Sequence, residues 1–293
     1  KRFIRFAESL YKGCSQYVPP LHKGQEHELM HAASLKYCQR KIWLAEDASG
    51  KVGGRICAMI NPRYNEKYGT KRARFGWFDL INDMDVAKLL FDAAESWAKG
   101  EGMEEIHGPL YYNTLGRQGM LVEGFDKLAP FTCLYNYPYY VKHIDDYGLV
   151  KENDWIEMQI YPPQDLPERF GRMAKIVEQR SNVRVDKVKS VKELKEKYGM
   201  TYMDVIDIAY QKLYNFQPLT DRQKKKYCEA YFPLLNFDFV TIVVNEKDEV
   251  VAVGVDMPDI SKAMRKTKGK LFPFGWYHLL KALKSDHYET IDF

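Results

Sequence analysis

A chain of 293 residues with 45% apolar and 29% charged residues has the composition of a globular protein of about two domains. Its net charge of +4 is too small to indicate a nucleic-acid-binding protein, and we expect no nucleic-acid partner. Five scattered cysteines without a C-x-x-C pair argue against a disulfide framework, and no apolar run is long enough to span a membrane, so we expect a cytoplasmic protein.

The N-terminal part of the sequence predicts a helix, a hairpin and a third strand. Apolar residues repeat with helical spacing over residues 2–12, and a Pro-Pro pair then interrupts the chain. Residues 42–46 and 52–60 are largely apolar and are separated by a polar turn that contains glycine. They are predicted to form a hairpin, and residues 75–81 are predicted to form the third strand.

The clearest predicted helix covers residues 85–102. Its apolar residues follow the spacing i, i+3, i+4, i+7, i+8, i+11, i+12, and they are Val86, Leu89, Leu90, Ala93, Ala94, Trp97 and Ala98. Asn82 or Asp83 can cap its N-terminus, while Gly100 and Gly102 favour its end. A strand over residues 105–110, a helix over 138–147 and a last strand over 155–160 are predicted to follow.

The second half of the sequence predicts the same order of elements again. Helices near residues 166–180, 191–197, 201–215 and 220–232, with a strand at 183–185, precede a hairpin over 240–244 and 250–255, a helix near 273–284 and a third strand from His287 to Phe293. We therefore predict an α/β fold of two tandem units, residues 1–161 and 162–293, each a mostly antiparallel sheet flanked by helices. Because the pattern stops within this strand, we expect the chain to be a piece of a longer protein.

The sharpest chemical motif is His27-Glu28-Leu29-Met30-His31. On a helix, H-E-x-x-H places two imidazoles one turn apart, so that they can share a Zn²⁺ ion while the glutamate activates a bound water. Taken alone, the motif predicts a zinc metallopeptidase, for which Glu46 or Glu66 is a conjectural third ligand. The polar neighbours Gln25 and Glu26 favour instead a solvated helix face.

Residues 77–110 and 136–155 resemble the GNAT superfamily of acyl-CoA-dependent N-acetyltransferases. The predicted order of hairpin, strand, helix, strand, helix and strand is that of the GNAT core, and residues 85–102 resemble its central helix, which ends in Trp-Ala-x-x-x-Gly. Residues 135–140 and 146–149 resemble the motif in which an asparagine contacts pantetheine and a tyrosine protonates the leaving thiolate. The resemblance implies a GNAT fold for each unit.

Shorter motifs are similar to those of a set of bacterial proteins that have two GNAT units and a poorly defined function. Bacterial ceramide-forming acyltransferases are related to that set. The motifs are Leu10-Tyr11-Lys12-Gly13, Val18-Pro19-Pro20-Leu21, His107-Gly108-Pro109, Leu121 to Asp126 and Leu271 to Gly275. The resemblance covers nearly the whole chain.

The resemblance implies transfer of an acyl group from acetyl-CoA or a longer acyl-CoA, as co-substrate, to a small-molecule or lipid-like amine. It implies that Asn136 contacts the pantetheine and that Tyr140 or His143 acts as acid or base. The family's usual spacing puts the tyrosine at Ile144, which is why both neighbours are candidates. The alternative is that the tyrosines are packing residues. No metal is expected.

The loop before the central helix departs from the family pattern. GNAT proteins hold the CoA pyrophosphate on a loop of the form R/Q-x-x-G-x-G/A, whose backbone N–H groups bind the phosphates. Here residues 79–87 contain no glycine, no arginine and three aspartates, which repel phosphates. We expect no usual CoA binding in the first unit, and a working phosphate loop, if there is one, after Phe293. If both sites have decayed, the protein is a non-catalytic GNAT-like ligand-binding module.

A basic cluster precedes an aromatic segment near the C-terminus. The cluster consists of Lys262, Arg265, Lys266, Lys268 and Lys270, and residues 271–277 follow it directly. Cations beside aromatic residues suit the surface of an anionic membrane. The sequence predicts either a peripheral membrane contact or a solvated basic loop before a core helix.

Overall fold

The computed structural model describes residues 1–163, 165, 167–232, 235–285 and 288–292. Their contacts divide the chain into two compact units. The first unit comprises Lys1–Asn153, Asn215–Gln217 and Asp259–His287, and the second comprises Asp154–Tyr214, Pro218–Pro258 and Tyr288–Phe293. The predicted α/β fold with mainly antiparallel sheets is confirmed, while the tandem duplication stays a prediction.

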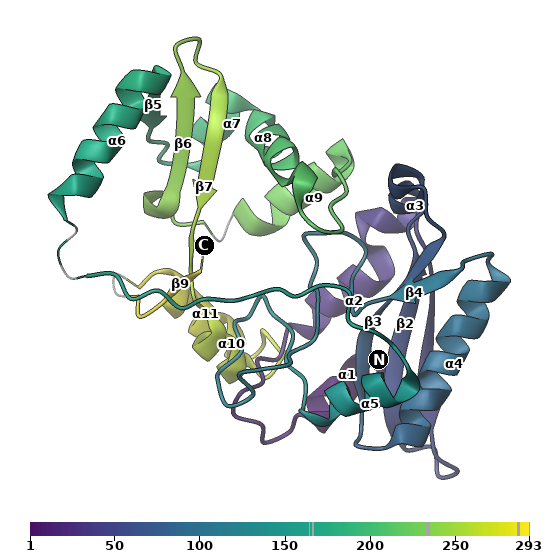
Figure 1. The fold of residues 1–293 in the computed structure, drawn as a ribbon. Helices are drawn as coiled ribbons and strands as arrows, with labels where there is room; N and C mark the ends of the chain where they lie inside the picture. The colour runs from purple at the N-terminus through teal and green to yellow at the C-terminus, as the bar shows by residue number, and fades with distance from the viewer. Residues whose placement is uncertain (164, 166, 233–234, 286–287, 293) are drawn as a thin grey trace. The chain divides into compact units, whose positions relative to one another are not determined.

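The first unit is built on a four-stranded sheet with the order β1-β2-β3-β4 (Figure 1). Strands β1 (Gln39–Glu46), β2 (Val52–Ile60) and β3 (Arg72–Leu80) are antiparallel, so the predicted hairpin and third strand are confirmed. Helix α4 (Met84–Gly100) then returns the chain to β4 (Glu105–His107), which is parallel to β3. The sheet therefore has the β3-α4-β4 crossover that positions the end of β3 next to the start of α4.

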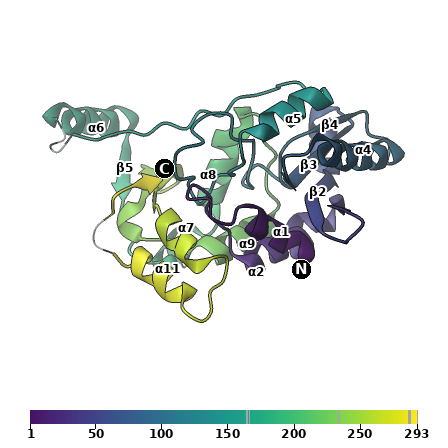
Figure 2. The same cartoon turned by 90° about the horizontal axis from the view of Figure 1, so that it is seen from below.

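Helices cover both faces of this sheet. The other helices of the first unit are α1 (Arg2–Leu10), α2 (His22–His31), α3 (Pro62–Tyr68), α5 (Tyr139–Tyr147), α10 (Ser261–Thr267) and α11 (Gly275–Leu283). Successive side chains of a strand point to opposite faces, so Ile56 and Ala58 pack in the cluster with α4, whereas Cys57 and Met59 pack in the cluster with α1 and α2. Figure 2 shows α4 and the pair α1 and α2 on opposite sides of the strands.

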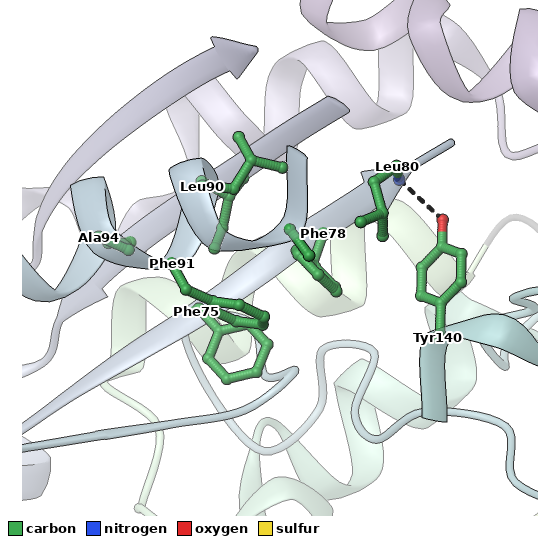
Figure 3. Close-up of a cluster of buried hydrophobic side chains, with 10 residues drawn as sticks. Phe75, Phe78, Leu80, Leu90, Phe91, Ala94 and Tyr140 are labelled. Atoms are coloured by element: carbon green, nitrogen blue, oxygen red, sulfur yellow. Dashed lines mark hydrogen bonds between the residues drawn. The ribbon is translucent and has the colours of Figure 1, made fainter. Parts of the chain in front are cut away.

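Helix α4 buries Leu90, Phe91 and Ala94 against the sheet (Figure 3). The predicted apolar stripe is correct for most of its members but wrong for Leu89, whose side chain is 63% exposed. The face of α4 that packs against the sheet is centred on Phe91, which the predicted stripe did not include. Gly54 of β2 lets the helix approach closely, because a Cβ atom there would lie 2.7 Å from Cδ1 of Leu90.

One prediction for the segment after α5 needs correction. Residues 155–160 alternate between apolar and polar side chains, but residues 148–163, all of them described, form neither helix nor strand. The prediction of a last strand is wrong because no neighbouring strand pairs with this segment, and Ile156, Met158 and Ile160 are exposed.

Residues 108–138 form one long loop, in which an isolated bridge joins Leu110 to Gln118. Long loops of this kind are commonly functional.

The second unit contains a three-stranded antiparallel sheet with the order β5-β6-β7. Its elements are α6 (Glu168–Ser181), β5 (Val183–Asp186), α7 (Val191–Tyr198), α8 (Thr201–Ala209), α9 (Asp221–Tyr231), β6 (Val240–Asn245), β7 (Val250–Val255), β8 (Met257–Pro258) and β9 (Ile291–Asp292). The predicted second hairpin is β6 and β7. Strand β9 pairs with β8 rather than extending this hairpin, and His287 and Phe293 lie outside the described residues.

Among the residues that the structure describes, no helix combines the length and the apolar character needed to cross a membrane.

Candidate functional site

A cavity of about 40 Å³ lies at the end of β3 in the first unit. Its lining includes Gln25, Arg55, Trp77, Asp79, Arg117, Cys133, Asn136 and Tyr140. The strands supply Arg55 and Asp79, α2 and α5 supply Gln25 and Tyr140, and the long loop supplies Arg117 and much of the remaining wall. The volume is enough for ordered water but not for an acyl chain.

An ion pair between Arg55 and Asp79 forms the floor of the cavity. The two residues are direct partners in the β2–β3 register, so their side chains lie on the same face of the sheet. Nη2 and Nε of Arg55 lie 2.6 and 2.7 Å from Oδ2 of Asp79, and Nη1 donates to the carbonyl of Phe3 at 2.7 Å. Both side chains are buried, so each charge depends on the other for its stabilisation.

Two phenol groups complete the network around Asp79. The hydroxyl of Tyr11 donates to Oδ1 of Asp79 at 2.9 Å and lies 3.0 Å from the hydroxyl of Tyr140. The hydroxyl of Tyr140 also accepts a hydrogen bond from the backbone N–H of Leu80 at 3.0 Å (Figure 3). Burial and the charge of Asp79 raise the pKa of both phenols well above the ordinary value. Both phenols therefore keep their protons at neutral pH and are not available as phenolate bases.

The structure separates the two residues that were predicted as acid or base. Tyr140 lines the cavity, whereas His143 does not. The Nε2 atom of His143 lies 3.0 Å from Oδ1 of Asn82, in the turn between β3 and α4, and its ring contacts Tyr139. His143 is thus placed to hold this turn, while Tyr140 is placed to contact a ligand. A catalytic role for either stays a prediction.

Asn136 lines the cavity, but its amide is already engaged. Its Oδ1 accepts from the N–H of Leu121 at 2.7 Å, and its Nδ2 donates to the carbonyls of Leu121 and Tyr137 at 3.0 and 3.2 Å. Both amide protons are used, so the side chain ties two parts of the long loop together. The predicted contact with pantetheine would require this amide to exchange partners.

Two polar atoms of the cavity lining have no hydrogen-bond partner within the described residues. They are Oε1 of Gln25, an acceptor, and Nε1 of Trp77, a donor. Both side chains are more than nine-tenths buried, and a buried polar atom without a partner costs about 1–3 kcal/mol. The cavity therefore offers one donor and one acceptor to a ligand with complementary groups.

Neither residue was predicted to belong to a site, and the prediction that Gln25 lies on a solvated helix face is wrong, because its side chain is buried. Trp77 lies where the register of β2 and β3 shifts between Arg55 and Cys57, and its backbone φ is +45°. A positive φ is rare for a tryptophan and marks a strained position, which is typical of functional sites. Its ring stacks on Tyr111 with 3.7 Å between the centroids. No local pattern indicated the bulge, whereas Gln25 could have been found from its spacing with Leu29 on the inner face of α2.

The N-terminus of α4 does not fit a pyrophosphate. The carboxylate of Asp83 accepts hydrogen bonds from the N–H groups of Asp85 and Val86, at 2.9 and 3.4 Å, and so caps the helix as predicted. These are N–H groups that a phosphate would need, and Asp85 adds a second negative charge in the first turn. We therefore assign no phosphate to this position.

Replacing Asp83 with alanine is expected to lower the free energy of unfolding by about 1 kcal/mol, because two backbone donors lose their acceptor. Urea unfolding of the full chain measures this effect. Asp85→Ala is the matched control, since it removes a charge from the same turn but no cap. Equal effects of the two substitutions would contradict the capping role.

The H-E-x-x-H motif lies on α2, and its histidines and its glutamate lie on different sides of the helix. His27 and His31 are exposed, with 5.9 Å between their ring centroids, while Glu28 is partly buried. Burial raises the pKa of Glu28 to about 7, which Arg117 partly opposes. Among the described residues, no group of three or more His, Cys, Asp or Glu side chains could hold a metal ion. The zinc hypothesis therefore gains no third ligand from Glu46 or Glu66.

Comparison with known proteins gives two bacterial relatives that match nearly the whole chain. Protein YghO of Escherichia coli (strain K12) is 29% identical over 287 residues, which cover 97% of this chain and 72% of YghO. A bacterial ceramide synthase of Caulobacter vibrioides (strain NA1000 / CB15N) is 26% identical over 298 residues, which cover 97% of this chain and 73% of the synthase. No family model and no solved structure matches the chain. The GNAT resemblance itself stays a prediction.

Proposed function

We propose that this protein transfers an acyl group from a thioester to an amine, and that the amine has a long, lipid-like chain. The observation that carries the proposal is the similarity to a bacterial ceramide synthase over 97% of the chain. A ceramide is a long-chain amino alcohol acylated on its nitrogen, so its formation is acyl transfer to an amine. The order of hairpin, strand, helix, strand and helix in the first unit, which resembles a GNAT core without its last strand, supports the same chemistry.

The reaction needs a small set of groups at one place. The amine nitrogen attacks the thioester carbonyl, a C–N bond forms, the C–S bond breaks, and the thiolate takes up a proton while the ammonium loses one. Trp77 Nε1–H can donate to the carbonyl oxygen on which charge develops, and Oε1 of Gln25 can accept from the amine. The hydroxyl of Tyr140, which keeps its proton, is the candidate donor to the thiolate.

Binding of a long-chain substrate requires the cavity to widen. Its volume of about 40 Å³ admits the polar head of a substrate only if the wall moves. Much of the wall lies in the irregular loop over residues 108–138, and Asn136 ties this loop together. We propose that opening of this loop admits the acyl chain, and that the phosphates of any CoA donor lie away from α4.

Incubation of the full chain with palmitoyl-CoA and sphinganine, a long-chain amino alcohol, tests the proposed function. We expect an N-palmitoyl product by mass spectrometry, and free thiol released in equal amount only when the amine is present. Thiol release without the amine would indicate a hydrolase instead. If neither product nor thiol forms with palmitoyl-CoA or acetyl-CoA, the proposal of acyl-CoA-dependent transfer is wrong.

Substitutions in the cavity separate catalysis from stability. Gln25→Leu and Trp77→Phe are expected to lower kcat/KM by about 10- to 100-fold, because each removes one hydrogen bond to the reacting groups. Gln25→Leu should leave the unfolding free energy unchanged or higher, since it removes an acceptor that has no partner. Trp43→Phe, at a partly buried tryptophan outside the cavity lining, is the matched control for the loss of an indole. Full activity of both cavity variants would contradict the assigned roles.

A second candidate is a non-catalytic ligand-binding module. The observation that favours it is the start of α4, where Asp83 occupies N–H groups that a CoA phosphate would use. Titration calorimetry with N-octanoyl-sphinganine, a long-chain amine that carries a short acyl group, distinguishes the module from the enzyme. Binding of this compound together with no turnover of any thioester supports the module, whereas turnover supports the enzyme.

A further inference from the structure

A basic and aromatic surface is formed by α10, α11 and the segment between them. Residues 260–285 contain seven lysines and arginines and no acidic residue, although the whole chain has a net charge of only +4. The rest of the chain is therefore net acidic. This concentration of positive charge in one segment favours contact with an anionic surface.

All five cations of the predicted basic cluster are exposed. On α10, Ala263, Met264 and Thr267 face the interior, so Lys262, Arg265 and Lys266 lie on the outer face. Lys268 and Lys270 follow the helix and are exposed as well. The alternation of buried and charged residues fixes Lys262, Arg265 and Lys266 on one side of this short helix.

Aromatic side chains lie exposed directly after these cations. Phe272 and Phe274 are 75% and 72% exposed, and Trp276 and Tyr277 are about half exposed. Large exposed apolar groups that cluster in this way mark an interaction site. Phenylalanine, tryptophan and tyrosine beside lysine are the composition of helices and loops that lie in the interface of a membrane.

The opposite side of the same elements is packed into the first unit. Ile260 and Met264 form a buried cluster with Val18, and Leu279 and Leu283 of α11 pack against it. The backbone N–H of His22 also donates to the carbonyl of Gly269 at 2.9 Å. The inner apolar residues therefore hold the two helices in place, and the outer aromatic residues are left without a role in this packing.

We propose that this surface docks the protein onto a membrane that contains anionic lipids. The cations provide long-range attraction to lipid phosphates, and the aromatic side chains insert at the level of the headgroups. This inference rests on exposure and charge and is independent of the proposed acyl transfer. Docking would place the protein where lipid-like substrates are found.

Sedimentation of the full chain with lipid vesicles tests the docking surface. We expect binding to vesicles that contain phosphatidylglycerol, little binding to pure phosphatidylcholine, and weaker binding as salt is raised. Arg265→Gln with Lys266→Gln, and separately Phe272→Ser with Phe274→Ser, are each expected to lower the partition coefficient about tenfold or more. Brominated lipids should quench the fluorescence of Trp276.

Matched variants on other surfaces serve as controls. Arg222→Gln with Lys225→Gln removes two exposed cations from α9, and Leu89→Ser removes an exposed apolar side chain from α4, and both should bind vesicles like the unchanged chain. Equal losses in control and test variants, or no binding to phosphatidylglycerol, would overturn the proposal. Binding of duplex DNA as tight as that of vesicles, and retained in the double serine variant, would assign the surface to nucleic acid and also overturn it.

Discussion

Replacing Asp79 with alanine is expected to lower the free energy of unfolding by about 3–5 kcal/mol. The substitution leaves the buried guanidinium of Arg55 without its counter-charge and removes the acceptor of the Tyr11 hydroxyl. A buried charge without a partner is among the most costly defects in a folded protein. Urea unfolding of the full chain, followed by circular dichroism, measures the loss.

Two further variants show whether the loss comes from the unpaired charge. Asp92→Ala breaks an exposed i,i+4 pair with Lys88 and a hydrogen bond from Tyr147, and it should cost much less than Asp79→Ala. The double variant Arg55→Met with Asp79→Leu removes both charges and should recover part of the stability that Asp79→Ala loses. If Asp79→Ala costs no more than Asp92→Ala, the pair is not essential to the fold.

Replacing Glu28 with glutamine is expected to stabilise the protein at pH 8 by up to about 3 kcal/mol and to change little at pH 5. Burial raises the pKa of Glu28 in the folded protein to about 7. Between its unfolded pKa and this value, the folded state binds one more proton than the unfolded state. The contribution of Glu28 to stability is therefore present at low pH and is lost as the pH rises to about 7.

Urea unfolding at pH 5 and pH 8 tests the direction of this pH dependence directly. The difference in unfolding free energy between the Glu28→Gln variant and the unchanged chain should grow with pH, because glutamate becomes charged in a buried position and glutamine does not. Glu26→Gln, on the exposed side of the same helix, is the control and should show no such dependence. A glutamine variant that is equally stabilised, or destabilised, at both pH values would contradict the burial of Glu28.

The elements that the sequence predicted well are those whose signal is local. The hairpin was predicted from two apolar segments and a polar turn, and α4 was predicted from its periodicity and its cap, Asp83. Their patterns span a few turns or a few residues and need no knowledge of a partner. The strand predicted over 155–160 failed for the opposite reason, since a strand exists only if another strand pairs with it.

The candidate site was only partly predictable, because it depends on which residues of β2 and β3 lie opposite each other. Tyr140 was reached through a family resemblance, and it does line the cavity. Arg55 and Asp79 are 24 residues apart, and only the β2–β3 pairing shows that they face each other. The bulge at Trp77 likewise depends on the neighbouring strand.

The H-E-x-x-H motif illustrates what a short pattern leaves open. The pattern fixes the spacing of His27, Glu28 and His31 along a helix but not which side of the helix faces the core. In the structure the histidines face solvent, and Glu28 lies toward the side that holds Gln25. The orientation of α2 is decided by the packing of Leu29 with α1 and the sheet, which the motif does not contain.

The measurement that tests the location of the site most directly is the alkylation of Cys133, an exposed thiol in the cavity wall. The rate of its modification by N-ethylmaleimide is followed by mass spectrometry with and without N-octanoyl-sphinganine. If acyl and amine groups bind in this cavity, the compound slows the alkylation of Cys133 in the unchanged chain and less so in the Gln25→Leu variant. An alkylation rate that saturating compound leaves unchanged would place the substrate elsewhere.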